Sequence, residues 1–179
     1  GFFPSYLVAD ARRDAQALFE RLGINIIMLN EEQTPLGGVE NWRDAKVCAD
    51  LFRQHSEEIH GVVVILPNFG DEKSVSDAIR LSGLKVPVLV QAEEDALDKM
   101  GLATRRDSFC GKISLCNNVR QYGIPFTLTK QHVCSLNSEV FSQDVEQFVQ
   151  LCRVVHAMKR VRVGAIGARP TNFNTVRYS

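Results

Sequence analysis

The sequence predicts an α/β fold built on a doubly wound parallel sheet with helices on both faces. The first observation is the apolar run 62–66, which is too short for a free-standing helix and suits a strand buried on both faces. The second is that Pro67, Asn68 and Gly70 end this run and a polar helical segment follows. The third is that the order of strand, loop and helix recurs along the chain, as it does in parallel sheets.

Short runs of β-branched and other apolar residues predict five strands. Pro87 lies near the start of the third run, where a strand tolerates proline. The strand order expected for such a chain is flavodoxin-like. The predicted strands span residues 24–29, 62–66, 86–90, 125–129 and 161–166.

Apolar residues at three- and four-residue spacing predict the helices. Pro4 suits the first turn of the first helix and Gly23 suits its end. Asn41 and Ser138 are typical N-caps for the second and the last helix. The predicted helices run over residues 5–22, from the Asn41 cap to about 52, from 73 to 83, over 104–122, and from the Ser138 cap to about 160.

The helix predicted over 104–122 begins with a capping box. The Thr104 hydroxyl and the Asp107 carboxylate would each accept a hydrogen bond from a free backbone N–H. The apolar stripe expected on this helix consists of Phe109, Ile113, Cys116 and Val119.

Composition narrows the class of protein. The chain has 179 residues, 45% of them hydrophobic, and Lys plus Arg equals Asp plus Glu at 21 each. Because the formal net charge is zero, the chain as a whole has no electrostatic attraction to nucleic acid or to an anionic membrane. No apolar run reaches the ~20 residues that a membrane-spanning helix needs. Five cysteines without a C-x-x-C pair indicate reduced thiols and a cytoplasmic protein.

The first predicted element is a helix without a strand before it, and the last is a strand without a helix after it. We therefore expect a piece of a longer polypeptide, truncated at both ends. Residues 1–160 would form an N-terminal α/β domain that lacks its first strand. Residues 161–179 would be the first strand and loop of a following domain.

Residues that follow predicted strands are the candidates for a ligand site, because ligands bind at the carboxyl ends of parallel strands. Phe69 offers an apolar face, and side-chain amides can form hydrogen bonds with a polar ligand. Arg169 could hold a carboxylate, although a structural ion pair explains it equally well. No spacing of Glu, Asp, His or Cys predicts a metal site. The candidate binding residues are Asn68, Phe69, Gln91, Arg105, Asp107 and Arg169.

Several stretches, in the right order over nearly the whole chain, resemble the N-terminal part of L-fucose isomerase-like proteins, which are related to L-fucose and L-arabinose isomerases. These stretches are residues 29–40 (LNEEQTPLGGVE), 66–72 (LPNFGDE), 88–92 (VLVQA), 105–112 (RRDSFCGK), 116–125 (CNNVRQYGIP), 163–170 (VGAIGARP) and 173–179 (FNTVRYS).

The resemblance implies a cytoplasmic aldose–ketose isomerase, an intramolecular oxidoreductase that uses a divalent metal, usually manganese. The metal ligands and catalytic acids of that family lie in later domains. This chain would therefore supply substrate-covering loops and contacts within a homo-oligomer, with no catalytic residue of its own, and would be inactive alone. The acidic stretch 92–94 departs from what a sugar site suggests. A non-catalytic sugar-binding or regulatory module is the alternative, because the same strand-end loops serve both functions.

Overall fold

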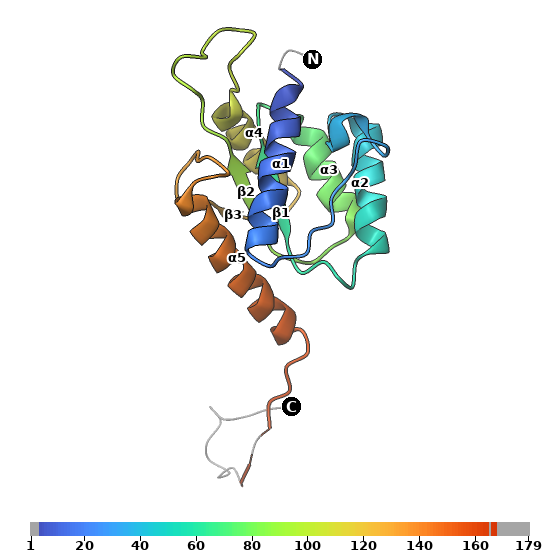
Figure 1. The fold of residues 1–179 in the computed structure, drawn as a ribbon. Helices are drawn as coiled ribbons and strands as arrows, with labels where there is room; N and C mark the ends of the chain where they lie inside the picture. Colours follow the sequence, from blue (N-terminus) through green and yellow to red (C-terminus); the bar gives the residue numbers. More distant parts are fainter. Residues whose placement is uncertain (1–3, 165, 168–179) are drawn as a thin grey trace.

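The computed structural model describes residues 4–164, 166 and 167. Within these residues five α-helices, one 3-10 turn and three strands follow one another along the chain (Figure 1). In chain order they are α1 (Tyr6–Arg21), η1 (Pro35–Gly37), α2 (Trp42–Gln54), β1 (Val62–Leu66), α3 (Glu72–Ser82), β2 (Val88–Ala92), α4 (Ser108–Gln121), β3 (Thr127–Leu128) and α5 (Glu139–Met158).

The three strands form one open parallel sheet in the order β1-β2-β3. Val62 pairs with Val88 and Leu66 with Ala92, so β1 and β2 match over their full length. The short β3 pairs with Leu89 and Val90. The predicted α/β class and the parallel sheet are confirmed.

Two predicted strands are wrong for the described residues. Residues 24–29 form no ladder with a neighbour, although they follow α1 as an apolar stretch. The described part of 161–166 has no regular structure either, and its apolar side chains are exposed, with Val163 at 90%. Strand propensity is not enough where no adjacent strand accepts the backbone hydrogen bonds. The strands predicted over 86–90 and 125–129 lie at 88–92 and 127–128.

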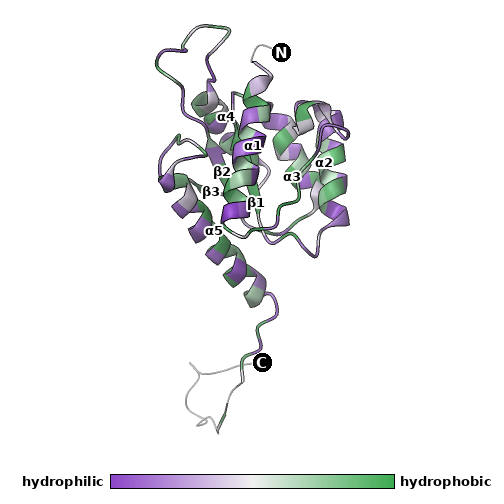
Figure 2. Ribbon diagram, viewed as in Figure 1, coloured by the Kyte–Doolittle hydropathy of each residue, from purple (hydrophilic) through white to green (hydrophobic). Residues whose placement is uncertain are grey.

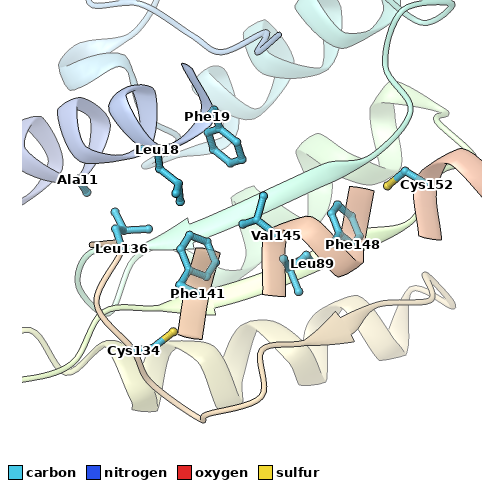
Figure 3. Packing of buried hydrophobic residues seen from close by; sticks show 11 residues of the cluster. Ala11, Leu18, Phe19, Leu89, Cys134, Leu136, Phe141, Val145, Phe148 and Cys152 are labelled. Atoms are coloured by element: carbon cyan, nitrogen blue, oxygen red, sulfur yellow. The ribbon is translucent and has the colours of Figure 1, made fainter. Parts of the chain in front are cut away.

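Side chains of the sheet join two apolar clusters. Leu89 packs with residues of α1 and α5, among them Leu18, Phe141 and Phe148 (Figure 3). The partly buried Val63 and Ile65 lie against this cluster. The even-numbered residues of β1 instead pack with residues of α3 and α4 in the second cluster. Alternate strand residues point in opposite directions, which explains this division.

Two details predicted for α4 are wrong. The Thr104 hydroxyl donates to the carbonyls of Lys99 and Gly101, and α4 begins only at Ser108, so Thr104 is not its N-cap. Asp107 holds the N-cap position in the left-handed region (φ 52°) without a side-chain capping bond. Its carboxylate is paired with Arg105 instead, at 2.8 Å.

The buried face of α4 also differs from the predicted stripe. Phe109 and Ile113 are exposed. The buried residues are Ser108, Gly111, Lys112, Leu115 and Val119. A Cβ on Gly111 would lie 2.1 Å from the backbone oxygen of Phe69. This close approach fixes which face of the helix turns inward, and it requires glycine.

The caps predicted for α2 and α5 are confirmed. Asn41 accepts hydrogen bonds from the N–H groups of Arg43 and Asp44, and Ser138 accepts from Phe141. Hydrophobic and hydrophilic residues alternate along α5 (Figure 2), whose apolar stripe packs on the first cluster. Among the described residues, no helix has both the length and the hydropathy needed to span a membrane.

Candidate functional site

Two loops lie together at the carboxyl ends of β1 and β2. The β1–α3 loop covers residues 67–71, and the β2–α4 loop covers residues 93–107. The Arg106 guanidinium donates to the carbonyl of Pro67 at 2.9 Å, which ties the base of the second loop to the first. The carboxylate of Asp95 accepts from the N–H of Arg106 at 2.7 Å. Arg106 thus fixes the relative position of the two loops.

Four of the predicted binding residues lie in or beside these two loops. The Asn68 carboxamide oxygen accepts from the N–H of Gly70 at 3.1 Å, which forms an Asx-type turn. Phe69 is partly buried, and its backbone packs against Gly111 of α4. Arg105 and Asp107 form an ion pair with each other. Their side chains remain partly exposed, at 39% and 32%.

The other two predicted residues lie differently. Gln91 is completely buried under the sheet edge, where its Nε2 donates to the carbonyl of Cys134 at 2.8 Å. Its Oε1 has no hydrogen-bond partner among the described residues, and the side chain does not reach the surface. The predicted position of Arg169 lies outside the described residues.

Sequence reasoning missed two charged residues that hold this edge together. The buried Lys112 of α4 donates to the Thr129 hydroxyl at 2.7 Å and to the carbonyl of His132 at 2.8 Å. Glu93, the first residue after β2, accepts from the N–H of Leu136 at 3.1 Å. Both connect to the β3–α5 loop, residues 129–138. Lys112 lies on the same helix face as Ser108, Leu115 and Val119, whereas the predicted apolar stripe ran through Phe109 and Ile113, so the spacing did not mark Lys112 as buried.

Burial shifts the pKa values of both Glu93 and Lys112. Burial raises the pKa of Glu93, although the Leu136 N–H, a hydrogen bond with Ser135 and the charge of Arg106 oppose the change. Burial lowers the pKa of Lys112, although the thiols of Cys134 and Cys116 and the Asp144 carboxylate oppose it. Perturbed groups are common at functional sites and also in structural networks. Here the contacts bind three loops to each other, which keeps the exposed residues of the edge in fixed positions.

The model of one protein family matches most of the chain. It is described as the fucose/sulfoquinovose isomerase N-terminal domain, and it matches residues 1–159. The chain belongs to this family. The match includes all three strands and both loops of the candidate site, so the resemblance to fucose isomerases is confirmed at the family level. No curated protein and no solved structure gives a significant match.

Two cavities of this isomerase-family domain lie away from the Arg105–Asp107 pair. The larger, about 510 Å³, lies at the amino ends of β2 and β3, between residues 83–88, residues 122–127 and α5. Ligands of parallel sheets bind at the opposite edge. The second, about 270 Å³, follows the length of β1 and reaches Asn68 and Asp71 at the carboxyl edge.

The isomerase-family domain offers no fit for a metal ion in the part of the chain that the structure describes. Among those residues, no three His, Cys, Asp or Glu side chains are grouped so that they could hold one. Glu93 and Asp95 lie near the candidate edge, but each accepts backbone N–H groups. No step of a reaction can therefore be assigned to a metal held by these residues.

Replacement of Glu93 should stabilise this domain at neutral pH. The raised pKa means that the folded state binds the Glu93 proton more tightly than the unfolded state, whose value is near 4.5. The contribution of Glu93 to folding therefore becomes less favourable as pH rises through the folded pKa. Glu93→Gln removes the charge and keeps an acceptor for Leu136. We expect it to raise the free energy of unfolding at pH 7 by less than about 1 kcal/mol.

Urea unfolding of both proteins between pH 4 and pH 8 measures this difference. The gain from Glu93→Gln should shrink toward pH 4, where wild-type Glu93 is protonated in the folded state. Glu94→Gln, at an exposed neighbouring position, is the matched control. A loss of stability in Glu93→Gln at pH 7 would mean that the carboxylate charge favours the fold.

Proposed function

We propose that this chain is the N-terminal part of a cytoplasmic, metal-dependent aldose–ketose isomerase that works as a homo-oligomer on a small sugar. The family match over residues 1–159 is the observation that carries this proposal. The five cysteines are free thiols, with Cys48, Cys134 and Cys152 buried, which agrees with a reducing compartment.

The β2–α4 loop supports the role of a substrate-covering and subunit-contacting element. It projects from the body of the domain (Figure 1) and carries three exposed apolar side chains. Leu97 is 94% exposed, Leu102 77% and Met100 55%. Apolar side chains gathered on a projecting loop are typical of a protein contact. Since Arg106 anchors the base of the loop, its tip would keep a defined direction toward a neighbouring subunit.

The sugar would lie against the loops that Arg106 ties together. Phe69 would contact the C–H groups of the sugar ring, and Asn68 and the Arg105–Asp107 pair would bind its hydroxyl groups. The catalytic acids and the ligands of a divalent metal such as manganese would come from other parts of the polypeptide. When bound, that metal would polarise the sugar oxygens. The residues described here would bind and enclose the sugar.

A kinetic comparison tests this division of labour. The 179-residue chain should show no aldose-to-ketose turnover with or without manganese. In the complete polypeptide, Phe69→Ala should raise KM several-fold and change kcat little, because this side chain would bind the ground and transition states alike. Phe109→Ala, an exposed ring on the neighbouring helix, serves as the control.

The results separate binding from folding. Thermal unfolding of each variant shows whether a change in KM reflects a weakened fold. Turnover by the isolated chain would place catalytic groups within it and overturn the proposal. An unchanged KM together with a lower Tm in Phe69→Ala would make Phe69 a packing residue and remove it from the sugar site.

A further inference from the structure

A groove at the amino ends of β2 and β3 combines apolar walls with positive charge. It is the cavity of about 510 Å³, and its only charged lining residues are Arg80 and Lys85. Arg80 is already paired with Asp77 at 3.1 Å. The ammonium group of Lys85 is exposed and has no partner among the described residues. We call this cavity the amino-edge groove, and it is lined by residues 79–80, 83–88, 122–127, 151 and 155.

One wall of the amino-edge groove continues into an exposed apolar stripe on α5. Leu151 and Val155 line the groove, and Val154 and Met158 follow the same side of the helix at three- and four-residue spacing. Val154 is 59% exposed and Met158 62%. The second half of α5 extends past the ends of the strands (Figure 1), so these side chains face solvent. An apolar surface of this kind is typical of a protein contact.

The tip of the β2–α4 loop has exposed apolar side chains and the opposite charge. Leu97, Met100 and Leu102 are the exposed apolar residues. Residues 94–104 contain three acidic residues and one lysine. The carboxylate of Asp98 is exposed and has no partner among the residues that the structure describes. The loop tip therefore complements the amino-edge groove in charge, and both surfaces are apolar.

We propose that the tip of the β2–α4 loop of one copy of this chain occupies the amino-edge groove of a second copy. Asp98 would pair with Lys85 at the rim of the contact. Leu97 and Leu102 would lie against the apolar walls, and Met100 would fill the space between them, because an unbranched thioether side chain adapts to irregular gaps. Two loop tips would bring acidic residues together, and two grooves would bring basic residues together. Charge therefore favours the contact of loop with groove over either symmetric contact.

The position of the two surfaces requires a second copy. The β2–α4 loop and the second half of α5 lie at opposite ends of the domain (Figure 1). Arg106 donates to the carbonyl of Pro67 and ties the base of the loop to the carboxyl edge of the sheet. The loop cannot reach the groove of its own chain from there. The contact is thus head-to-tail, and each copy offers one loop and one groove.

This contact makes specific the subunit contact of the proposed function, and it rests on that proposal only in taking a second copy as the partner. A loop tip in a groove buries less than the area of about 1,200–2,000 Å² that is usual for stable complexes. We therefore expect the 179-residue chain to associate weakly, with a Kd of about 10–100 μM. Sedimentation measures this association without turnover, so either proposal can fail while the other holds.

Substitutions at exposed positions test the two surfaces separately. In sedimentation equilibrium, the chain of 20.0 kDa should associate as its concentration rises from about 5 to 500 μM. Leu97→Asp on the loop and Leu151→Asp in the groove should each weaken the association at least about tenfold, because each places a carboxylate in the apolar contact. Ile113→Asp, at an exposed position of α4, is the control and should associate like the wild type. Thermal unfolding shows whether each variant is folded.

A mixture of the two variants distinguishes a head-to-tail contact from a symmetric one. Leu97→Asp keeps an intact groove and Leu151→Asp keeps an intact loop, so a pair of unlike chains has one productive contact. An equimolar mixture should form dimers that do not grow further, although each variant alone stays monomeric at the same concentration. If Leu151→Asp does not fold, Lys85→Glu takes its place in the mixture, because Lys85 is exposed.

A charge exchange tests the pair of Asp98 with Lys85. Lys85→Glu should weaken the association by roughly threefold to tenfold. Asp98→Lys in the same chain should restore it, because the exchanged pair again carries opposite charges. A wild-type chain that stays monomeric at about 500 μM would overturn the proposal. So would a mixture that forms no dimer, or a loss of association in Ile113→Asp, which would place the interface on the outer side of α4.

Discussion

Gly111→Ala is expected to destabilise the domain strongly, with a loss of about 1–3 kcal/mol. In a domain of this size, such a loss lowers Tm by roughly 2–12 °C. The added Cβ would lie 2.1 Å from the Phe69 oxygen and 2.8 Å from its Cα, which are backbone atoms between β1 and α3. They cannot rotate away as a side chain could. Alanine would otherwise favour the helix by about 1 kcal/mol, so a loss can only come from this contact.

The matched control is Asn117→Ala on the exposed side of the same helix. This substitution raises helix propensity by a comparable amount and brings no new atom into contact with a neighbouring residue. The Tm of the variant should therefore stay the same or rise. Differential scanning calorimetry of both variants and of the wild type measures the difference. If Gly111→Ala matched the control, α4 would not lie against the β1–α3 loop as closely as described.

Asp77→Ala is the second substitution with a large expected effect. The carboxylate of Asp77 is buried and accepts hydrogen bonds from Lys73 at 2.8 Å, Tyr122 at 3.0 Å and Arg80 at 3.1 Å. Tyr122 lies at the end of α4, so this carboxylate joins α4 to α3. Because the Lys73 and Arg80 side chains are exposed, no buried charge is left unpaired, and the lost hydrogen bonds cost about 1–3 kcal/mol. We expect urea unfolding to show a loss of that size.

The pH dependence of Asp77→Asn isolates the charge. Burial alone would raise the pKa of Asp77, but the hydrogen bonds from Lys73, Tyr122 and Arg80 outweigh it and hold the pKa below its usual 3.8. The unfolded state then binds the proton more readily. The stability that the charge provides is therefore complete above about pH 5 and is lost as pH falls through the folded pKa.

The advantage of the wild type over Asp77→Asn should accordingly be present at pH 7 and disappear in acid. Asp50→Asn is the control, since Asp50 pairs with Arg53 at a site where both side chains are half exposed. Such surface pairs contribute about 0.5 kcal/mol or less. A pH-independent gap between wild type and Asp77→Asn would show that geometry, and not charge, holds α3 to α4.

Local sequence signals predicted most of the helices because their causes are local. The Asn41 and Ser138 side chains cap helices with their own next turn, within three residues. The run 62–66 forms a strand at the predicted residues. The predicted Thr104 cap failed because the helix takes the alternative start at Ser108, with Asp107 at the N-cap position. Sequence alone does not rank two such alternatives of similar energy.

The sequence could predict those residues of the candidate site that lie close to the ends of predicted strands. Asn68 and Phe69 follow β1 as predicted, whereas Arg105 and Asp107, predicted in the first turn of a helix over 104–122, precede α4, which begins at Ser108. Their role toward a sugar remains a prediction. The buried position of Gln91 depends on Cys134, which lies 43 residues further along the chain. Lys112 likewise depends on Thr129 and His132. Contacts between distant segments leave no periodic signal in either one.

The sequence by itself determined the α/β class, the parallel direction of the strands, most helix boundaries and the resemblance to fucose isomerases, because each depends on short-range patterns or on motif order. Tertiary structure alone decided which face of α4 is buried, through the approach of Gly111 to Phe69. It also decided that 24–29, despite its apolar residues, forms no strand. A strand exists only where a neighbouring backbone receives its hydrogen bonds, and that neighbour is a property of the fold.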